Sequence, residues 1–180
     1  AWNADGTGFY YTRYPRSGER PPVDLNFYQQ VYFHRLGTDT RQDSYSLGKD
    51  FPRIAEIQLR ASVDGRYILA SMANGDGGEF AHYLLGPDGQ WHQIARLSDE
   101  ISAAAFGTDG YLYLLSHLNA RKGKVLRVSL DRPRLAEAQA VDPASRVARA
   151  YAMPAATPAA GDEMPGGTSR VQGVGPAAQA

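Results

Sequence analysis

Runs of apolar and aromatic residues recur along the chain and are separated by short turns that contain glycine. The run YQQVYFHRLGT at 28–38 shows the pattern, because an extended backbone would place Val31 and Phe33 on one face and Tyr32 and His34 on the other. Both faces of this strand are therefore bulky. A strand of this kind belongs inside a sheet that is itself packed between two neighbouring sheets.

Asp-Gly dipeptides stand between these runs at Asp5, Asp64, Asp88 and Asp109. Asp-Gly is a strong hairpin signal, since glycine adopts positive φ at little cost. Three segments repeat the turn followed by an aromatic-containing strand: NADGTGFYYT, SVDGRYILAS and GTDGYLYLLS. Asp64 and Asp109 are 45 residues apart, and about 40–50 residues is the length of one four-stranded propeller blade.

One period can be divided into four strands joined by short reversals. The predicted strands are Ala55–Leu59, Tyr67–Ala73, Phe80–Leu85 and Trp91–Leu97. The next unit begins at Ile101 with small side chains, which suit a crowded strand near a propeller axis, and it includes an outer strand at 124–130.

The composition changes near Asp131, after which Tyr151 is the only aromatic residue and alanine, proline and glycine dominate. Such a segment buries too little apolar area to offset its ordering entropy. We therefore predict an all-β fold, a partial β-propeller of two to three four-stranded antiparallel blades over 1–131, with blades at approximately 1–50, 51–99 and 100–131. An irregular Ala/Pro/Gly-rich tail is expected over 132–180, with a short helical turn at 134–139.

Charge and composition narrow the function classes. The 180 residues contain 19 basic and 19 acidic side chains without a block of like charge, so neither a nucleic-acid partner nor a membrane partner is favoured. We expect a soluble protein, cytoplasmic or periplasmic, and the absence of cysteine does not distinguish these compartments. The chain begins at Ala1 rather than methionine, and we expect this start to be incomplete.

Candidate catalytic and metal-binding residues are few. A hydrolase-type serine nucleophile needs a strained G-x-S-x-G elbow, and the nearest imitation, Ser169, is followed by Arg170 and Val171 instead. Four histidines could act as bases or metal ligands: His34, His82, His92 and His117. They lack the close spacing of zinc ligands, and each is better interpreted as a hydrogen-bonded or rim histidine. We predict no catalytic residue, metal site or cofactor in this chain.

Five segments together closely resemble the amino-terminal propeller of the prolyl oligopeptidase family of serine peptidases: FYYTRYP, YQQVYFHRLGT, LGKDFP, DGRYILAS and NGDGGEFAHYLL. In that family a seven-bladed propeller caps an α/β-hydrolase domain on the same chain. The pair cleaves short peptides after proline, and the propeller admits only small, unfolded substrates. The resemblance covers about 1–131 and implies that this chain is the gating part of such a peptidase.

The resemblance also implies one substrate contact. Asp50-Phe51-Pro52 matches an acid-Phe-Pro sequence whose phenylalanine lines an apolar subsite facing the catalytic domain in the family. Phe51 is therefore the one predicted substrate-binding residue. The alternative is that Phe51 packs between blades, as most aromatic residues in such chains do.

Two functions from different classes remain open. The first is a substrate-gating propeller portion of a prolyl oligopeptidase-like serine endopeptidase, whose partners are a hydrolase domain and short proline-containing peptides. The second is a non-catalytic propeller fragment that binds proteins or peptides, or a degenerate remnant.

Overall fold

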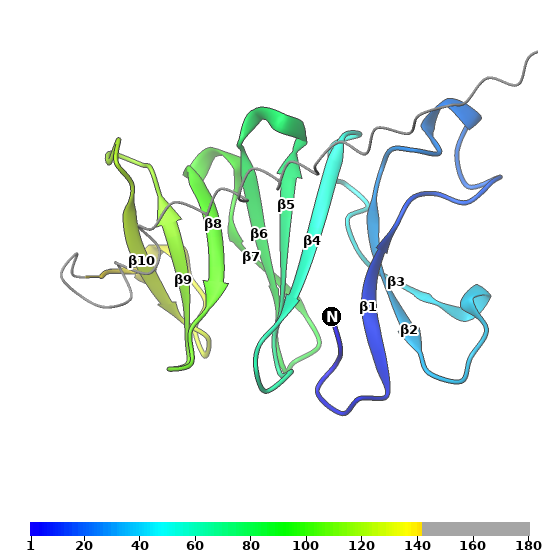
Figure 1. Ribbon diagram of the computed structural model, residues 1–180, viewed down its shortest axis with the longest axis horizontal. Helices are drawn as coiled ribbons and strands as arrows, with labels where there is room; N and C mark the ends of the chain where they lie inside the picture. Colours follow the sequence, from blue (N-terminus) through cyan, green and yellow to red (C-terminus); the bar gives the residue numbers. More distant parts are fainter. Residues whose placement is uncertain (142–180) are drawn as a thin grey trace, which may run out of the picture.

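Three antiparallel β-sheets stand side by side in chain order (Figure 1). The computed structural model describes residues 1–141. The first sheet contains β1 (Gly8–Arg13), β2 (Gln30–Arg35) and β3 (Ser44–Leu47). The second contains β4 (Ala55–Ala61), β5 (Ile68–Asn74), β6 (Phe80–Leu85) and β7 (Trp91–Ala95). The third contains β8 (Ile101–Phe106), β9 (Tyr111–Ser116), β10 (Lys124–Ser129) and β11 (Gln139–Ala140).

Each sheet is a meander whose consecutive strands are hydrogen-bonded neighbours. Five short 3-10 turns lie in the connections: η1 (Pro22–Asp24), η2 (Thr40–Gln42), η3 (Gly75–Gly77), η4 (Leu97–Asp99) and η5 (Leu135–Glu137). The all-β fold predicted from the sequence is confirmed. The predicted four-strand meander agrees with β4 to β7 to within two residues at each end.

The Asp-Gly turns at Asp5, Asp64, Asp88 and Asp109 lie at one end of the sheets, the lower end in Figure 1. Their glycines have φ between 67° and 79°, the left-handed region that glycine adopts most easily. At Asp64 the carboxylate accepts hydrogen bonds from the Ser62 hydroxyl (2.6 Å) and the Arg66 amide (3.1 Å), which holds the reversal between β4 and β5. The same end carries the connections with the 3-10 turns η2 and η5, and a cleft of about 310 Å³ beside Asp88 and Asp131.

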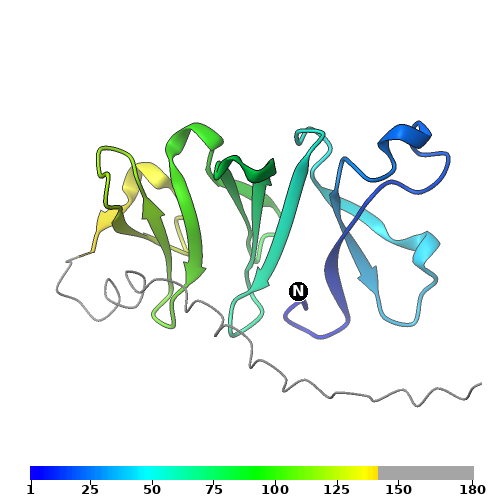
Figure 2. The same ribbon diagram turned by 45° about the horizontal axis from the view of Figure 1, so that its top comes forward.

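The opposite end of the sheets carries the longest connection, residues 14–29 between β1 and β2, and will be called the loop end. It includes η1, η3 and η4, which rise together along the top of the sheets in Figure 2. The connection from β3 into β4 and the connection from β9 into β10 also lie there. The two ends of the sheets therefore differ in the connections that they carry.

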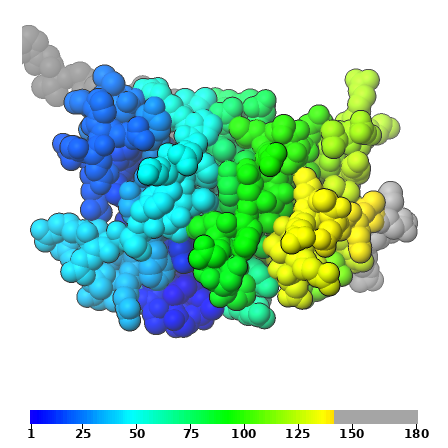
Figure 3. All heavy atoms as spheres, turned by 180° about the vertical axis from the view of Figure 1, so that it is seen from behind, coloured from blue at the N-terminus to red at the C-terminus, as the bar shows by residue number. Residues whose placement is uncertain are grey.

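Apolar side chains fill both spaces between neighbouring sheets. Val31 is fully buried and packs with Ala55, Ile57 and Ala70 between the first and second sheets. A larger cluster between the second and third sheets is centred on five nearly inaccessible side chains: Leu69, Leu84, Ile101, Leu112 and Leu114. Seen from behind, the outer strands of the three sheets form one continuous packed wall (Figure 3).

The two bulky faces of β2 are covered in different ways. Its Val31 face packs on the second sheet, as predicted. Its opposite face has no neighbouring sheet among residues 1–141. There Asp43 accepts hydrogen bonds from Tyr11 (2.5 Å) and from His34 (2.7 Å). Burial raises the pKa of Asp43, but these hydrogen bonds lower it by more, and the carboxylate is held ionised.

A buried histidine links the second sheet to the third. His82 in β6 is 1% exposed, with Nδ1 3.0 Å from the Ser71 hydroxyl and Nε2 3.2 Å from the carbonyl oxygen of Ile101. Because a carbonyl only accepts, Nε2 carries the hydrogen, and in the neutral ring Nδ1 accepts from the Ser71 hydroxyl. Burial lowers the pKa of His82, although the hydrogen bond to Ile101 acts in the opposite direction.

The third sheet extends beyond residue 131, where the sequence analysis set the start of the tail. Gln139 and Ala140 form β11, which pairs with Arg127 and Leu126 of β10. The helical turn expected at 134–139 corresponds to η5. The rest of the predicted tail, 142–180, lies outside the described residues.

The close approach of β1 and β2 at Gly8 predicts a strong effect of one added methyl group. A Cβ at Gly8 would collide with the carbonyl oxygen of His34 and the ring of Phe33. We expect Gly8→Ala to lower the free energy of unfolding by about 1–3 kcal/mol in urea denaturation. Gly77→Ala is the matched control, because a Cβ there meets no atom within 4 Å. Equal stability of the two variants would contradict this packing.

The neutral His82 ring predicts that stability falls in mild acid. The pKa of His82 is lowered from 6.5 in the folded protein, so below that value the unfolded chain binds more protons and stability decreases as the pH falls. From pH 7 to 5 we expect His82 to add a slope of up to about 1.4 kcal/mol per pH unit to the unfolding free energy.

His82→Gln should remove this part of the slope, and His92→Gln, which replaces an exposed imidazole, should keep it. Urea titrations at several pH values measure both. An unchanged slope in His82→Gln would show that the buried ring does not carry the effect.

Candidate functional site

Three clefts at the loop end are lined by polar side chains from different elements. One cleft, of about 430 Å³, lies between the second and third sheets. Two more, of about 280 and 240 Å³, lie side by side at the first and second sheets and share Tyr14 and Glu56. The loop end is therefore our candidate site, because a ligand or another domain resting there would meet all three.

The cleft between the second and third sheets combines carboxylates with an aromatic wall. It is lined by Gly78, Glu79, Phe80, Leu97, Ser98, Glu100, Ile101, Ser102 and His117. Glu100 ends η4 in the left-handed region, with φ of 53°, and its carbonyl accepts the amide hydrogen of His117 (2.9 Å). This contact joins the β7–β8 connection to the end of β9 and fixes one wall of the cleft.

His117 and Ser102 form a pair within this cleft, with Nε2 of the histidine 3.0 Å from the serine hydroxyl. The Ser102 hydroxyl in turn donates to the carbonyl of Leu115 at 3.5 Å, a long hydrogen bond. No carboxylate in the described part of the chain is hydrogen-bonded to His117. The pair therefore lacks the third group that orients the base in serine hydrolases.

The clefts at the first and second sheets are bordered by an arginine held in place. Arg53 lies over the ring of Phe27, 3.5 Å from its centroid, and pairs with Asp24 at 2.9 Å. These contacts join the β1–β2 connection to the start of β4. They occupy the guanidinium group, so Arg53 is interpreted as a structural clamp.

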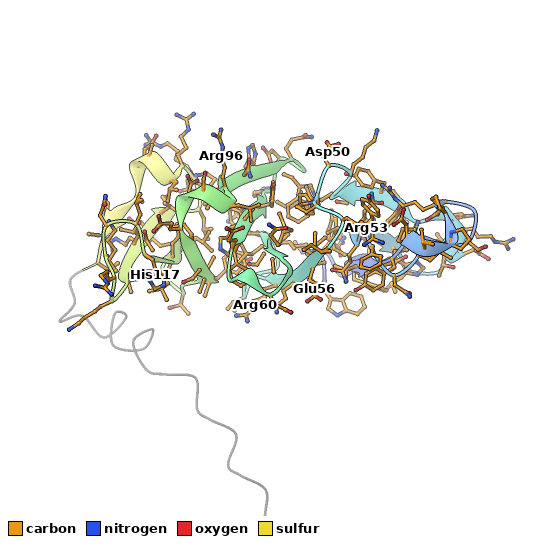
Figure 4. The ribbon with its side chains drawn as sticks, turned by 90° about the horizontal axis from the view of Figure 1, so that it is seen from above. Asp50, Arg53, Glu56, Arg60, Arg96 and His117 are labelled. Carbon is orange, nitrogen blue, oxygen red and sulfur yellow. The ribbon has the colours of Figure 1, made fainter. Side chains whose placement is uncertain are left out.

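The charged side chains labelled in Figure 4 lie on two opposite sides of the row of sheets, and Arg60 among them lies near the Asp-Gly end of β4. Glu56 and Arg60 lie on the side formed by the first strands of the second and third sheets, as does His117. Asp50 and Arg96 lie on the side of the last strands. The first group faces the concave, axial side of a propeller and the second faces its circumference.

Phe51, the predicted substrate-binding residue, is packed between the first and second sheets. Its ring centroid lies 5.1 Å from that of Tyr83, and it contacts the cluster around Val31 and Ala55. The preceding Asp50 is exposed at the loop end. The packing alternative therefore describes the geometry of Phe51, and its contact with substrate stays a prediction.

The four histidines have different hydrogen-bond partners and lie far apart in the sequence. His34 pairs with Asp43, His92 pairs with Asp88 at 2.8 Å, and the other two are described above. No group of three or more potential metal ligands occurs in residues 1–141. Ser169 lies outside the described residues. None of the helical turns described is long enough to cross a bilayer.

The sequence analysis did not anticipate the cleft formed by Glu79, Glu100, Ser102 and His117. These residues come from three separate connections, and no local spacing joins them. The only early signal was the repeat itself, which indicates that equivalent connections meet at one end of the sheets.

Comparisons with known proteins agree with this architecture. The family model for the N-terminal beta-propeller domain of prolyl oligopeptidase matches residues 1–150. A prolyl endopeptidase of Elizabethkingia meningoseptica is 29% identical over 139 residues, which is 74% of this chain and 19% of that protein. Prolyl oligopeptidase A of Galerina marginata is 27% identical over 108 residues, covering 52% of this chain and 14% of that protein.

Solved structures show the same fold. A structure from a study of two prolyl endopeptidases has a TM-score of 0.64 at 21% identity and covers 81% of this chain and 21% of that one. Apo prolyl oligopeptidase B of Galerina marginata has a TM-score of 0.58 at 19% identity, covering 78% of this chain and 19% of that one. This chain thus spans about a fifth of the length of these relatives or less.

Proposed function

This chain belongs to the prolyl oligopeptidase family through its amino-terminal propeller domain, and we propose that it is the substrate-gating part of a serine-type endopeptidase. Its three sheets would be three blades of the propeller. The enzyme would cleave short peptides after proline. The observation that carries the proposal is the family match over residues 1–150, most of the chain.

The chemistry would come from an α/β-hydrolase domain in the same polypeptide. No G-x-S-x-G elbow occurs in the sequence, and the His117–Ser102 pair has no orienting carboxylate among the residues described. We place the hydrolase domain against the loop end, because three clefts lie there and the connection that carries Phe51 ends there.

Gating would follow from how the sheets pack. The spaces between neighbouring sheets are filled by buried side chains, so a peptide cannot pass between them. Its remaining route is along the axial side, where Glu56, Arg60 and His117 lie. A route of this kind admits an extended peptide and excludes a folded protein.

A second function is favoured by the clefts themselves. The 430 Å³ cleft combines Phe80 and Leu97 with the carboxylates of Glu79 and Glu100, which is a suitable surface for a peptide without any catalysis. A chain whose gene supplies no hydrolase domain would then be a peptide-binding module. Sequencing the locus downstream of Ala180 distinguishes the two functions.

Because the proposed chemistry comes from the hydrolase domain, we predict that the 180-residue chain alone is inactive. We expect no hydrolysis of a chromogenic peptide with proline before the scissile bond, because no activated nucleophile is present. The assay needs a preparation free of contaminating peptidases. Turnover that persists in Ser169→Ala would overturn the prediction, since it would require a nucleophile elsewhere in the chain.

The predicted contact of Phe51 with substrate can be tested by substitution in a polypeptide that joins this chain to its hydrolase domain. We expect Phe51→Ala to raise KM for a proline-containing peptide by roughly tenfold, as expected when about 1.4 kcal/mol of apolar contact is lost. It should also lower stability, because Phe51 packs on Tyr83.

Phe106→Ala is the matched control, because Phe106 is also partly buried but lies at the Asp-Gly end. It should lower stability and leave KM unchanged. If KM rises in both variants, or in neither, then Phe51 acts only in packing and does not contact substrate.

A further inference from the structure

The cleft between the second and third sheets carries negative charge. Glu79 directly precedes β6 and Glu100 directly precedes β8, so two carboxylates line this 430 Å³ cleft from neighbouring connections. No lysine or arginine among residues 1–141 lines it. Arg121 and Lys122 lie close after His117 in the β9–β10 connection, but neither belongs to the lining of the cleft. The charge is therefore not neutralised by the walls of the cleft.

Both carboxylates have hydrogen-bonding capacity left for a ligand. Glu79 accepts one hydrogen bond, from the side-chain amide of Asn74 at 3.2 Å. The Glu100 carboxylate forms no hydrogen bond or ion pair within the described part of the chain. Arg96, at the start of the same connection, lies on the opposite side of the row of sheets from His117 (Figure 4). Since a carboxylate has about four acceptor sites, most of them stay available here.

The backbone holds Glu100 at this point in an unfavourable conformation. Its φ of 53° lies in the left-handed region, which costs a residue with a Cβ free energy. The carbonyl of Glu100 accepts the amide hydrogen of His117 at 2.9 Å, so the backbone is fixed there. Glycine adopts this conformation more easily, and local folding therefore does not favour a glutamate at this position. The position of its side chain in the cleft offers a reason for it.

The other walls of the cleft suit the apolar stem and the charge of a basic side chain. Phe80 and Leu97 provide apolar surface, and the ring of Phe80 can also attract a cation. The Ser102 hydroxyl donates to the carbonyl of Leu115, so Nε2 of His117 donates in its contact with Ser102. Both hydrogens are directed at protein atoms and do not compete with a ligand for the carboxylates.

We propose that this cleft is a specificity subsite that binds an arginine or lysine side chain of a peptide substrate through Glu79, Glu100 and Phe80. The carboxylates accept hydrogen bonds from the charged group, while Phe80 and Leu97 pack on its methylene stem. The peptidase then prefers basic proline-containing peptides to neutral ones. That the ligand is a substrate rests on the proposed function, whereas binding in the cleft needs no hydrolase domain.

The test compares two peptides by titrating the backbone amide chemical shifts of the 180-residue chain. One is acetyl-Gly-Arg-Gly-Pro-amide, and the other carries citrulline, which has nearly the shape of arginine without its charge. We expect the arginine peptide to bind at least about fivefold more tightly, and high salt to reduce this ratio. The amides of Glu79, Glu100 and Ser102 should shift, and that of Gly65, at the Asp-Gly end, should not.

Two variants separate this cleft from general attraction to acidic surface. The variant that combines Glu79→Gln with Glu100→Gln should bind both peptides equally, because the amides keep the size and remove the charge. Glu56→Gln is the matched control, since Glu56 is also exposed but lines the neighbouring clefts, and it should keep the preference.

Equal binding of the two peptides by the unchanged chain would overturn the proposal, as would an equal loss of preference in both variants. Hydrolysis is measured separately, in the polypeptide that joins this chain to its hydrolase domain. A preference for the arginine peptide without any hydrolysis would overturn the peptidase function and support the cleft as a site for basic side chains.

Discussion

The second sheet is stable only if both of its faces are covered, and the arrangement of the other sheets follows from this requirement. Leu69 and Leu84 face the third sheet, whereas Ala70 and Ala81 on the same strands face the first. A sheet with two apolar faces cannot end at water without a large loss of burial. Side-chain hydrogen bonds at both interfaces add direction to this packing, among them those from Trp91 to Ser46 (2.8 Å) and from His82 to Ile101.

Much of the fold could be predicted because its determinants are local. Asp-Gly at Asp64 and Asp109 fixes the reversals, and the alternation after each turn fixes the following strand. The strand β11 could not be predicted, because Gln139 and Ala140 carry no apolar pattern and are held by backbone pairing to β10 and by hydrogen bonds from Arg127 to the Gln139 side chain. The isolated bridge between Trp2 and Phe9 was equally hidden, since its evidence is a pair of backbone hydrogen bonds between Ala1 and Tyr10.

The candidate site was less accessible to sequence reasoning than the fold. Phe51 was found through a resemblance, but its packing against Tyr83 depends on how two sheets meet. Ser102 reaches His117 because the register of β8 against β9 shifts between Ile101 and Ala103. Such a bulge redirects a side chain without leaving a signature in the order of residues. A site formed by side chains from separate connections can therefore be recognised only in the three-dimensional structure.

The absence of backbone pairing between sheets has a mechanical consequence. Within each sheet the strands are tied by ladders of hydrogen bonds, whereas neighbouring sheets in the described part of the chain are joined by side chains and by single connecting segments. The protein is therefore anisotropic, stiff within each sheet and more compliant across the interfaces. A force that pulls the sheets apart at the loop end acts on apolar surfaces that separate gradually. The row of sheets can therefore bend at the interfaces while every strand keeps its register.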